Sequence, residues 1–186
     1  RLTAQTDEAS AGGVPLLARD WQVEPFPEPG PAPTGTVLVL TADERPGLAE
    51  AFAPAVVVTL RQGSDFVDVP TAVAAVRALL DRSPVTGLLD LCALAEGTGD
   101  EHDAGPWTAR LAILQQVLAA RPAGGLRVLQ VTGGLFGLRG TEPNPAGARL
   151  SGFVRSIGAE HPWVRSTVLD TDRPERLAEL LAVWRD

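Results

Sequence analysis

The sequence of 186 residues contains no tyrosine and no lysine. A reaction that needs a tyrosine acid or a lysine amine must therefore obtain that group from another chain or from protein outside these residues. Aromatic residues make up only 5% of the sequence, although 45% of it is hydrophobic. The core must accordingly consist of leucine, valine and alanine, which is typical of parallel strands that helices bury on both faces.

Positive charge and cysteine are also scarce. The 16 basic residues, all arginine, and 23 acidic residues leave a net charge of −7, and a chain this acidic is a poor binder of nucleic acid. Cys92 is the only cysteine, which excludes an intrachain disulfide and a multi-cysteine metal site. No apolar run has the length of a membrane helix and no signal-peptide pattern opens the sequence, so we expect a soluble, cytoplasmic protein without a membrane partner.

The N-terminal region has the composition of connecting segments. Residues 1–13 are small and polar and end in two glycines, which indicates a linker. A first strand is expected within residues 14–24, around Trp21. Proline then occupies every second position from 25 to 33, so residues 25–35 are predicted to form a stiff, extended connector. Apart from this connector, residues 14–186 are predicted to form one domain.

From residue 36 onward, short apolar runs alternate with helical patterns. Strands are predicted at 37–40, 55–60, 87–94, 126–131 and 164–169. Helices are predicted near 46 and at 71–82, 106–120, 145–160 and 174–184. This alternation is typical of a parallel sheet covered on both sides. The predicted fold is therefore doubly wound α/β and Rossmann-like, with a mostly parallel sheet.

The first turn between a strand and a helix has unsuitable chemistry for a dinucleotide. That turn is normally glycine-rich, because only glycine lets the backbone approach the pyrophosphate at the helix N-terminus. Residues 41–47 (TADERPG) contain one glycine and place Asp43 and Glu44 where phosphates would lie. Arg61 follows the second strand and could pair with a ribose 2′-phosphate, but this requires a first turn that holds the pyrophosphate, which residues 41–47 do not provide. We expect no cofactor site here.

A second glycine-rich segment, residues 132–137 (TGGLFG), also follows a predicted strand. It matches the beginning of the Thr-Gly-x-x-x-Gly-x-Gly pattern of short-chain dehydrogenases. Arg139 stands where the last glycine should be, and Pro143 and Pro145 oppose a helix that starts at the glycines. A phosphate cradle needs that helix, so we interpret the segment as a loop that crosses the carboxyl edge of the sheet.

Other reactive side chains have plainer interpretations. His102 lies among acidic residues, a pattern more typical of a solvated loop than of a cation site. His161 lies at a predicted helix end, where it complements the helix dipole. Ser151 and Ser156 are not in a Gly-x-Ser-x-Gly elbow, so a hydrolase triad with His161 and Asp170 has no support. Cys92 lies in an apolar run and is interpreted as a small buried hydrophobe. We predict no catalytic, cofactor-binding or metal-ligating residue in this chain.

Residues 144–162 (NPAGARLSGFVRSIGAEHP) and 167–172 (TVLDTD) resemble the ketoreductases of type I polyketide synthases. In that family a Pro-x-x-Ala-x-Leu-x-Gly-hydrophobic-x-Arg helix runs into Glu-hydrophilic-Pro, and the next strand ends in an Asp-x-Asp step. The broader resemblance covers about residues 14–186, including the segments around Trp21 and Trp107. It implies the family's first, truncated Rossmann half, which has lost its cofactor site and braces the second, catalytic half.

The resemblance also implies what the parent enzyme does. Family members reduce a β-ketoacyl thioester on an acyl carrier protein with NADPH, in the biosynthesis of polyketides such as antibiotics. Their catalytic Tyr, Ser and Lys or Asn belong to the half that would follow residue 186, so none is carried over to this chain. The implied partners are that catalytic half and neighbouring synthase domains, with the acyl carrier protein an indirect partner. Two alternatives remain open: a pseudo-ketoreductase interaction module, and an intact nucleotide-using enzyme of another doubly wound family.

A chain that keeps apolar sequence but no recognisable chemistry is expected to act through shape and docking. We therefore predict a broad apolar contact with a partner, and tryptophan is a frequent anchor at such contacts. The candidate interface residues are Trp21, Leu177, Leu180, Leu181 and Trp184. The alternative is that Trp184 completes the core of this domain itself.

Overall fold

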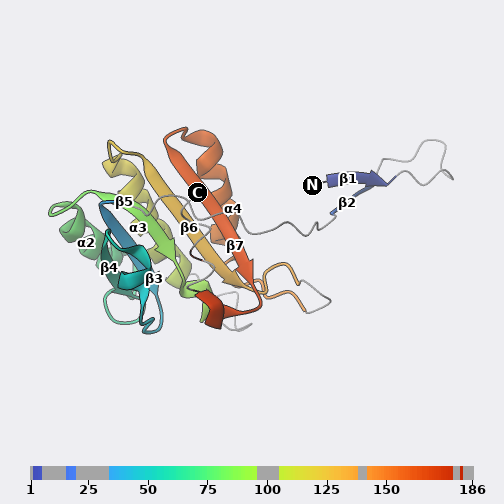
Figure 1. The fold of residues 1–186 in the computed structure, drawn as a ribbon, viewed down its shortest axis with the longest axis horizontal. Coiled ribbons are helices and arrows are strands. Elements are labelled where there is room, and N and C mark those ends of the chain that lie inside the picture. The colour runs from blue at the N-terminus through green and yellow to red at the C-terminus, as the bar shows by residue number, and fades with distance from the viewer. Residues whose placement is uncertain are drawn as a thin grey trace.

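The computed structural model describes residues 2–5, 16–19, 34–95, 105–137, 142–177 and 181. In these ranges a five-stranded sheet has the order β4-β3-β5-β6-β7, and all of its strands are parallel (Figure 1). The strands are β3 (Thr36–Thr41), β4 (Val56–Arg61), β5 (Val85–Asp90), β6 (Leu126–Gly133) and β7 (Val164–Thr171). The helices are α1 (Leu48–Phe52), α2 (Val69–Leu80), α3 (Gly105–Ala120) and α4 (Ala148–Glu160), with short 3₁₀ helices η1 (Cys92–Leu94) and η3 (Pro174–Arg176). The predicted doubly wound α/β fold is confirmed.

The strand order locates the place where such folds bind ligands. When its strands are numbered along the chain, the sheet has the order 2-1-3-4-5, one of the two common doubly wound orders. The same order results when the outer third strand is removed from the Rossmann order 3-2-1-4-5-6, which agrees with a truncated Rossmann fold. The direction of winding reverses between β3 and β5, so the carboxyl ends of these two strands flank the customary ligand crevice.

Helices cover both faces of the sheet, but unequally. Successive side chains of a strand point to opposite faces. In β3, Val37 and Val39 therefore face α1, whereas Leu38 and Leu40 face α2, α3 and α4, and all four are at most 1% exposed. The α1-face cluster contains Val37, Val39, Leu48, Phe52, Leu89, Leu91, Leu129, Val131, Leu177 and Leu181. Burial on both faces explains why β3 appears in the sequence as a continuous apolar run.

Helix α2 begins two residues earlier than the hydrophobic pattern suggested. Asp68 is its N-cap: a carboxylate oxygen accepts a hydrogen bond from the Thr71 amide at 2.9 Å, and the Thr71 hydroxyl accepts one from the Asp68 amide at 3.2 Å. This reciprocal capping box satisfies amides that the first turn of a helix leaves without partners. The pKa of Asp68 is lowered, first by its side-chain hydrogen bond with Thr71 and then by the Thr71 backbone.

Two other boundaries differ from prediction for local reasons. Strand β5 ends at Asp90, because the carboxylate of Asp90 accepts the amide of Cys92 at 3.0 Å and turns the chain into η1. Cys92 is fully buried, as predicted. It lies in η1, just beyond the strand that was expected to contain it. Helix α4 begins at Ala148 instead of residue 145, because Gly147 before it adopts a left-handed φ of 78°.

The two ends of the chain also differ from prediction. Leu2–Gln5 form strand β1, which pairs antiparallel with β2 (Leu16–Arg19), so the expectation of a linker over residues 1–13 does not hold for residues 2–5. This pairing joins segments on either side of the glycines, and local composition does not encode such a contact. Strand β2 falls within the predicted first strand, whereas Trp21 and most of the 25–35 connector lie outside the described residues. At the C-terminal end, where a helix over 174–184 was predicted, the described residues contain η3 and two buried leucines.

None of the helices in the described ranges is long and apolar enough to cross a membrane.

Candidate functional site

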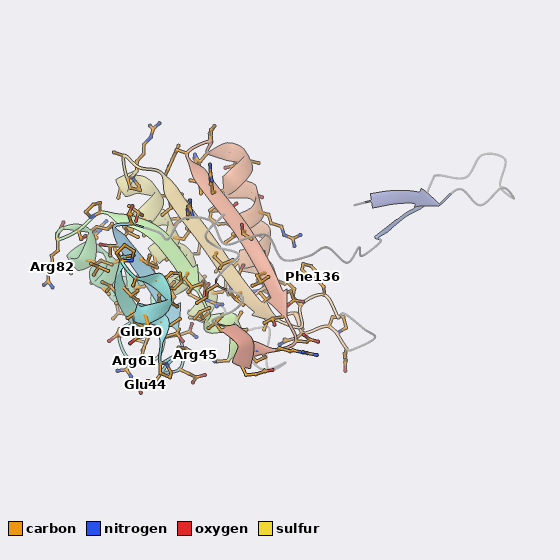
Figure 2. The ribbon with its side chains drawn as sticks, in the orientation of Figure 1. Glu44, Arg45, Glu50, Arg61, Arg82 and Phe136 are labelled. Atoms are coloured by element: carbon orange, nitrogen blue, oxygen red, sulfur yellow. The ribbon has the colours of Figure 1, made fainter. Side chains whose placement is uncertain are left out.

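The carboxyl edge of β3 carries the turn that would hold a dinucleotide. In this turn the Thr41 hydroxyl donates to the Asp43 carbonyl at 2.8 Å. Glu44 accepts a hydrogen bond from the Arg61 guanidinium at 3.0 Å, and Arg45 lies 3.7 Å from the carboxylate of Asp43. Figure 2 shows Glu44, Arg45 and Arg61 gathered at one end of the sheet. The turn thus carries carboxylates where a phosphate would lie, and Arg61 is already held by one of them.

The carboxyl end of β5, on the other side of the crevice, contains a buried ion pair. Arg110 of α3 places its Nη1 atom 3.5 Å from Oδ1 of Asp90, and the two side chains are only 1% and 4% exposed. The same Asp90 oxygen accepts the amide of Cys92. A guanidinium is buried at this depth only when its charge is compensated. The pair therefore fixes α3 against the end of β5.

Our sequence analysis did not identify Arg110. The signal was present, because this arginine is surrounded by alanine, leucine and isoleucine in the apolar helix pattern of 109–114. Pairing it with Asp90 required knowledge of which strand α3 covers.

The glycine-rich segment after β6 forms a turn, as the loop interpretation predicted, and within the described residues the next helix begins only at Ala148. Asp170 of β7 is bound by this turn. Its Oδ1 atom accepts hydrogen bonds from the Thr132 hydroxyl and the Leu135 amide, both at 2.8 Å, and its Oδ2 atom accepts the Phe136 amide at 2.9 Å. Asp170 is the first aspartate of the Asp-x-Asp step noted in the sequence. In this chain the carboxylate fastens the turn to β7.

The start of α4 is fastened to β6 in a similar way. Gln130 donates from its side-chain nitrogen to the Gly147 carbonyl at 3.1 Å, and its oxygen accepts the Ser151 hydroxyl at 2.8 Å. A Cβ atom on Gly147 would lie 2.8 Å from the Cβ of Ala93 and 3.0 Å from a methyl carbon of Thr132. Glycine is thus required at this position both by the close approach and by the positive φ. The helix motif that carries the family resemblance serves packing in this chain.

The side chains considered for a hydrolase triad have other partners. The hydroxyl of Ser151 is bound to Gln130, and that of Ser156 donates to the Gly152 carbonyl within α4. His161 has Trp163 as a ring neighbour at a centroid distance of 5.7 Å. His102 and its acidic neighbours lie outside the described residues. Among the residues that the structure describes, no cluster of three or more His, Cys, Asp or Glu side chains is suited to hold a metal ion.

The predicted docking residues are only partly described. Leu177 and Leu181 are 7% and 3% exposed and belong to the α1-face cluster. They cover the chain's own sheet, so these two leucines do not form an exposed docking face. Leu180, Trp21 and Trp184 lie outside the described residues, and their role stays a prediction.

Comparison with known proteins identifies the family. A family described as the Rossmann-fold domain of polyketide synthase extender module SpnB matches residues 19–185. The chain belongs to this family. It is 30% identical over 175 residues to a mycocerosic acid synthase-like polyketide synthase of Mycolicibacterium smegmatis, a match that covers 84% of the chain and 8% of that synthase.

A solved structure agrees with this assignment. The C2-type ketoreductase from a modular polyketide synthase shares 26% sequence identity with the chain, with a TM-score of 0.55. The match covers 83% of the chain but only 37% of that ketoreductase. The resemblance to polyketide synthase ketoreductases, first noted in residues 144–162 and 167–172, is thereby confirmed. The chain spans a small part of both relatives.

Proposed function

We propose that this chain is a non-catalytic structural subdomain that braces the catalytic half of a polyketide synthase ketoreductase. The observation that carries the proposal is the chemistry of the first turn. Asp43 and Glu44 bring negative charge to the position of the pyrophosphate, and Glu44 engages Arg61 at 3.0 Å, the one cation that our sequence analysis considered for a ribose phosphate. These residues do not fit a nucleotide phosphate, because a phosphate site needs free amides or cations.

The absence of tyrosine and lysine supports the same proposal. The sequence has no tyrosine and no lysine, and ketone reduction needs a positioned proton donor of suitable acidity. Its buried aspartate, Asp90, and the motif aspartate, Asp170, are both bound within the fold. The parent enzyme is proposed to reduce a β-ketoacyl thioester on an acyl carrier protein with NADPH, and the proton donor and the cofactor site belong to protein outside this chain.

Two measurements test this function. Titration calorimetry of the purified chain with NADPH and with NADH is expected to show no saturable heat. Reductase assays on a β-keto thioester are expected to show turnover only when the adjoining catalytic half of the synthase is supplied, and this half should be more stable in the presence of the chain. Saturable micromolar binding of either cofactor, or turnover by residues 1–186 alone, would overturn the proposal.

A further inference from the structure

In the part of the chain that the structure describes, no helix starts at the glycines of the turn after β6, but the backbone amides of this turn alone have the geometry of an anion site. Gly134 and Gly137 adopt left-handed φ angles of 75° and 56°. Between them, the successive amides of Leu135 and Phe136 point to one carboxylate, and each bonds a different oxygen of it. Successive amides in a turn of this kind form a concavity that binds anions, as in many phosphate sites. The Thr132 hydroxyl adds a third donor.

One positively charged side chain, Arg155, also lies beside this turn. The guanidinium carbon of Arg155 lies 5.1 Å from the centre of the Phe136 ring, and Phe136 lies beside the carboxyl end of β7 in Figure 2. This contact places a cation from α4 next to the turn. Two amides, a hydroxyl and a nearby guanidinium are the kinds of groups that bind a phosphate oxygen.

The anion present in this concavity belongs to the chain itself. Asp170 receives all three hydrogen bonds, at 2.8, 2.8 and 2.9 Å. We infer that the turn at 132–137 is a latent phosphate site that the carboxylate of Asp170 keeps occupied, so that the turn accepts an external phosphate only when this carboxylate is removed. This inference concerns the β6 turn alone and does not depend on the bracing role, which rests on the first turn and on a partner.

The first turn, at residues 41–47, and the turn at 132–137 share one feature at the carboxyl edge of the sheet. In each of them, a group that could bind phosphate is already bound to a carboxylate of the same chain: Arg61 to Glu44, and the amides of Leu135 and Phe136 to Asp170. The hydrogen bonds from the Leu135 and Phe136 amides to Asp170 are charge-assisted, and such bonds are among the stronger ones in proteins. A carboxylate tethered in the fold also competes with free phosphate at a high effective concentration.

The test compares four forms of the ¹⁵N-labelled chain. The amide signals of Leu135 and Phe136 are followed as inorganic pyrophosphate is added at constant ionic strength. The unmodified chain is expected to show no saturable shift. The Asp170→Ala variant should show saturable shifts at both amides with a dissociation constant on the order of 1 mM. The control Thr132→Val removes the hydroxyl but keeps the carboxylate, and it should behave like the unmodified chain.

A second substitution at Asp170 controls for the case in which Asp170→Ala unfolds the turn locally. Asp170→Asn keeps an oxygen that can accept the Leu135 amide and replaces the acceptor of the Phe136 amide by a donor, so the turn stays anchored while one amide is released. It should bind pyrophosphate more weakly than Asp170→Ala, with the larger shift at Phe136. Saturable binding by the unmodified chain or by Thr132→Val would overturn the inference, and so would absence of binding by both Asp170 variants, whatever structure their turns adopt.

Discussion

Replacing Gly147 by alanine should destabilise the domain more than the same replacement at Gly47 or Gly152. The φ of 78° at this position costs an alanine about 1–2 kcal/mol. The new Cβ atom would lie 2.8 Å from the Cβ of Ala93 and 3.0 Å from Thr132, and such overpacking costs about 1–3 kcal/mol. Loss of unfolded-state entropy offsets about 0.4–1 kcal/mol of this. The expected net loss is about 3 kcal/mol, which corresponds to a decrease of roughly 6–12 °C in Tm for a domain of this size.

Two other glycines separate the backbone contribution from the contact. Gly47 has a φ of 82° but open space around its Cβ position, so Gly47→Ala should lower Tm by only about 2–4 °C. Gly152 lies within α4, also has open space and carries no positive φ, so Gly152→Ala should leave Tm unchanged or raise it, since alanine is better than glycine in a helix by up to about 1 kcal/mol. The measurement is thermal unfolding of the purified chain, followed by circular dichroism. A Gly147→Ala variant that loses no more than Gly47→Ala would refute the close approach of α4 to Ala93 and Thr132.

Three further substitutions test the remaining contacts. Arg110→Met should lower the free energy of unfolding, measured in urea, by about 3–5 kcal/mol, because it leaves the buried Asp90 without its guanidinium partner. Adding Asp90→Asn should restore part of this loss. Equal stability of Arg110→Met and the unmodified chain would contradict a structural ion pair. Asp68→Ala should lower Tm at neutral pH. Hydrogen bonds from Thr71 hold the pKa of Asp68 in the folded chain below 3.8. The cap therefore stabilises the fold fully above that value, and this stabilisation is lost as the pH falls through the lowered pKa. A difference in Tm between Asp68→Ala and the unmodified chain that stays constant in acid would refute the cap. Glu44→Ala breaks only an exposed ion pair and should change stability by less than about 1 kcal/mol, and a larger change would show that the first turn is structural.

The sequence was sufficient to predict the alternation of strands and helices along the chain and a mostly parallel sheet, but not the order of its strands. The inner strands β3, β5 and β6 are almost fully buried and are mostly apolar in sequence. Helices α2 and α4 show the three-to-four-residue spacing of a covered face. The element boundaries were predicted less well, because side chains set them. The carboxylate of Asp90 ends β5 early and that of Asp68 starts α2 early. A hydrophobic pattern does not record which polar side chain caps which amide.

The contacts of the candidate site depend on non-local proximity. Asp170 was recognised as part of a family signature, but its bonds reach amides in a turn on the far side of α4 in the sequence. Leu177 and Leu181 were predicted to contact a partner. The spacing of apolar residues in a segment shows that one face is covered, but it does not show whether the covering surface belongs to the same chain or to a partner. The structure identifies that surface as the α1 side of the chain's own sheet.

The all-parallel pairing of the main sheet has a consequence for how fast the domain can fold. Strand β3 pairs with both β4 and β5, with Thr36 opposite Val56 on one side and Val85 on the other, so neither of these pairs is closed by a tight hairpin. Two parallel strands can pair only after the intervening chain, which includes at least one helix, has closed into a loop. The entropy cost of closing such long loops slows strand pairing. Helices such as α2 and α3 can form from local contacts long before that. The pairing of β3 with β5 spans all of β4 and α2, and we therefore expect it to form late in folding. Until it forms, the apolar faces of these two strands are exposed to water.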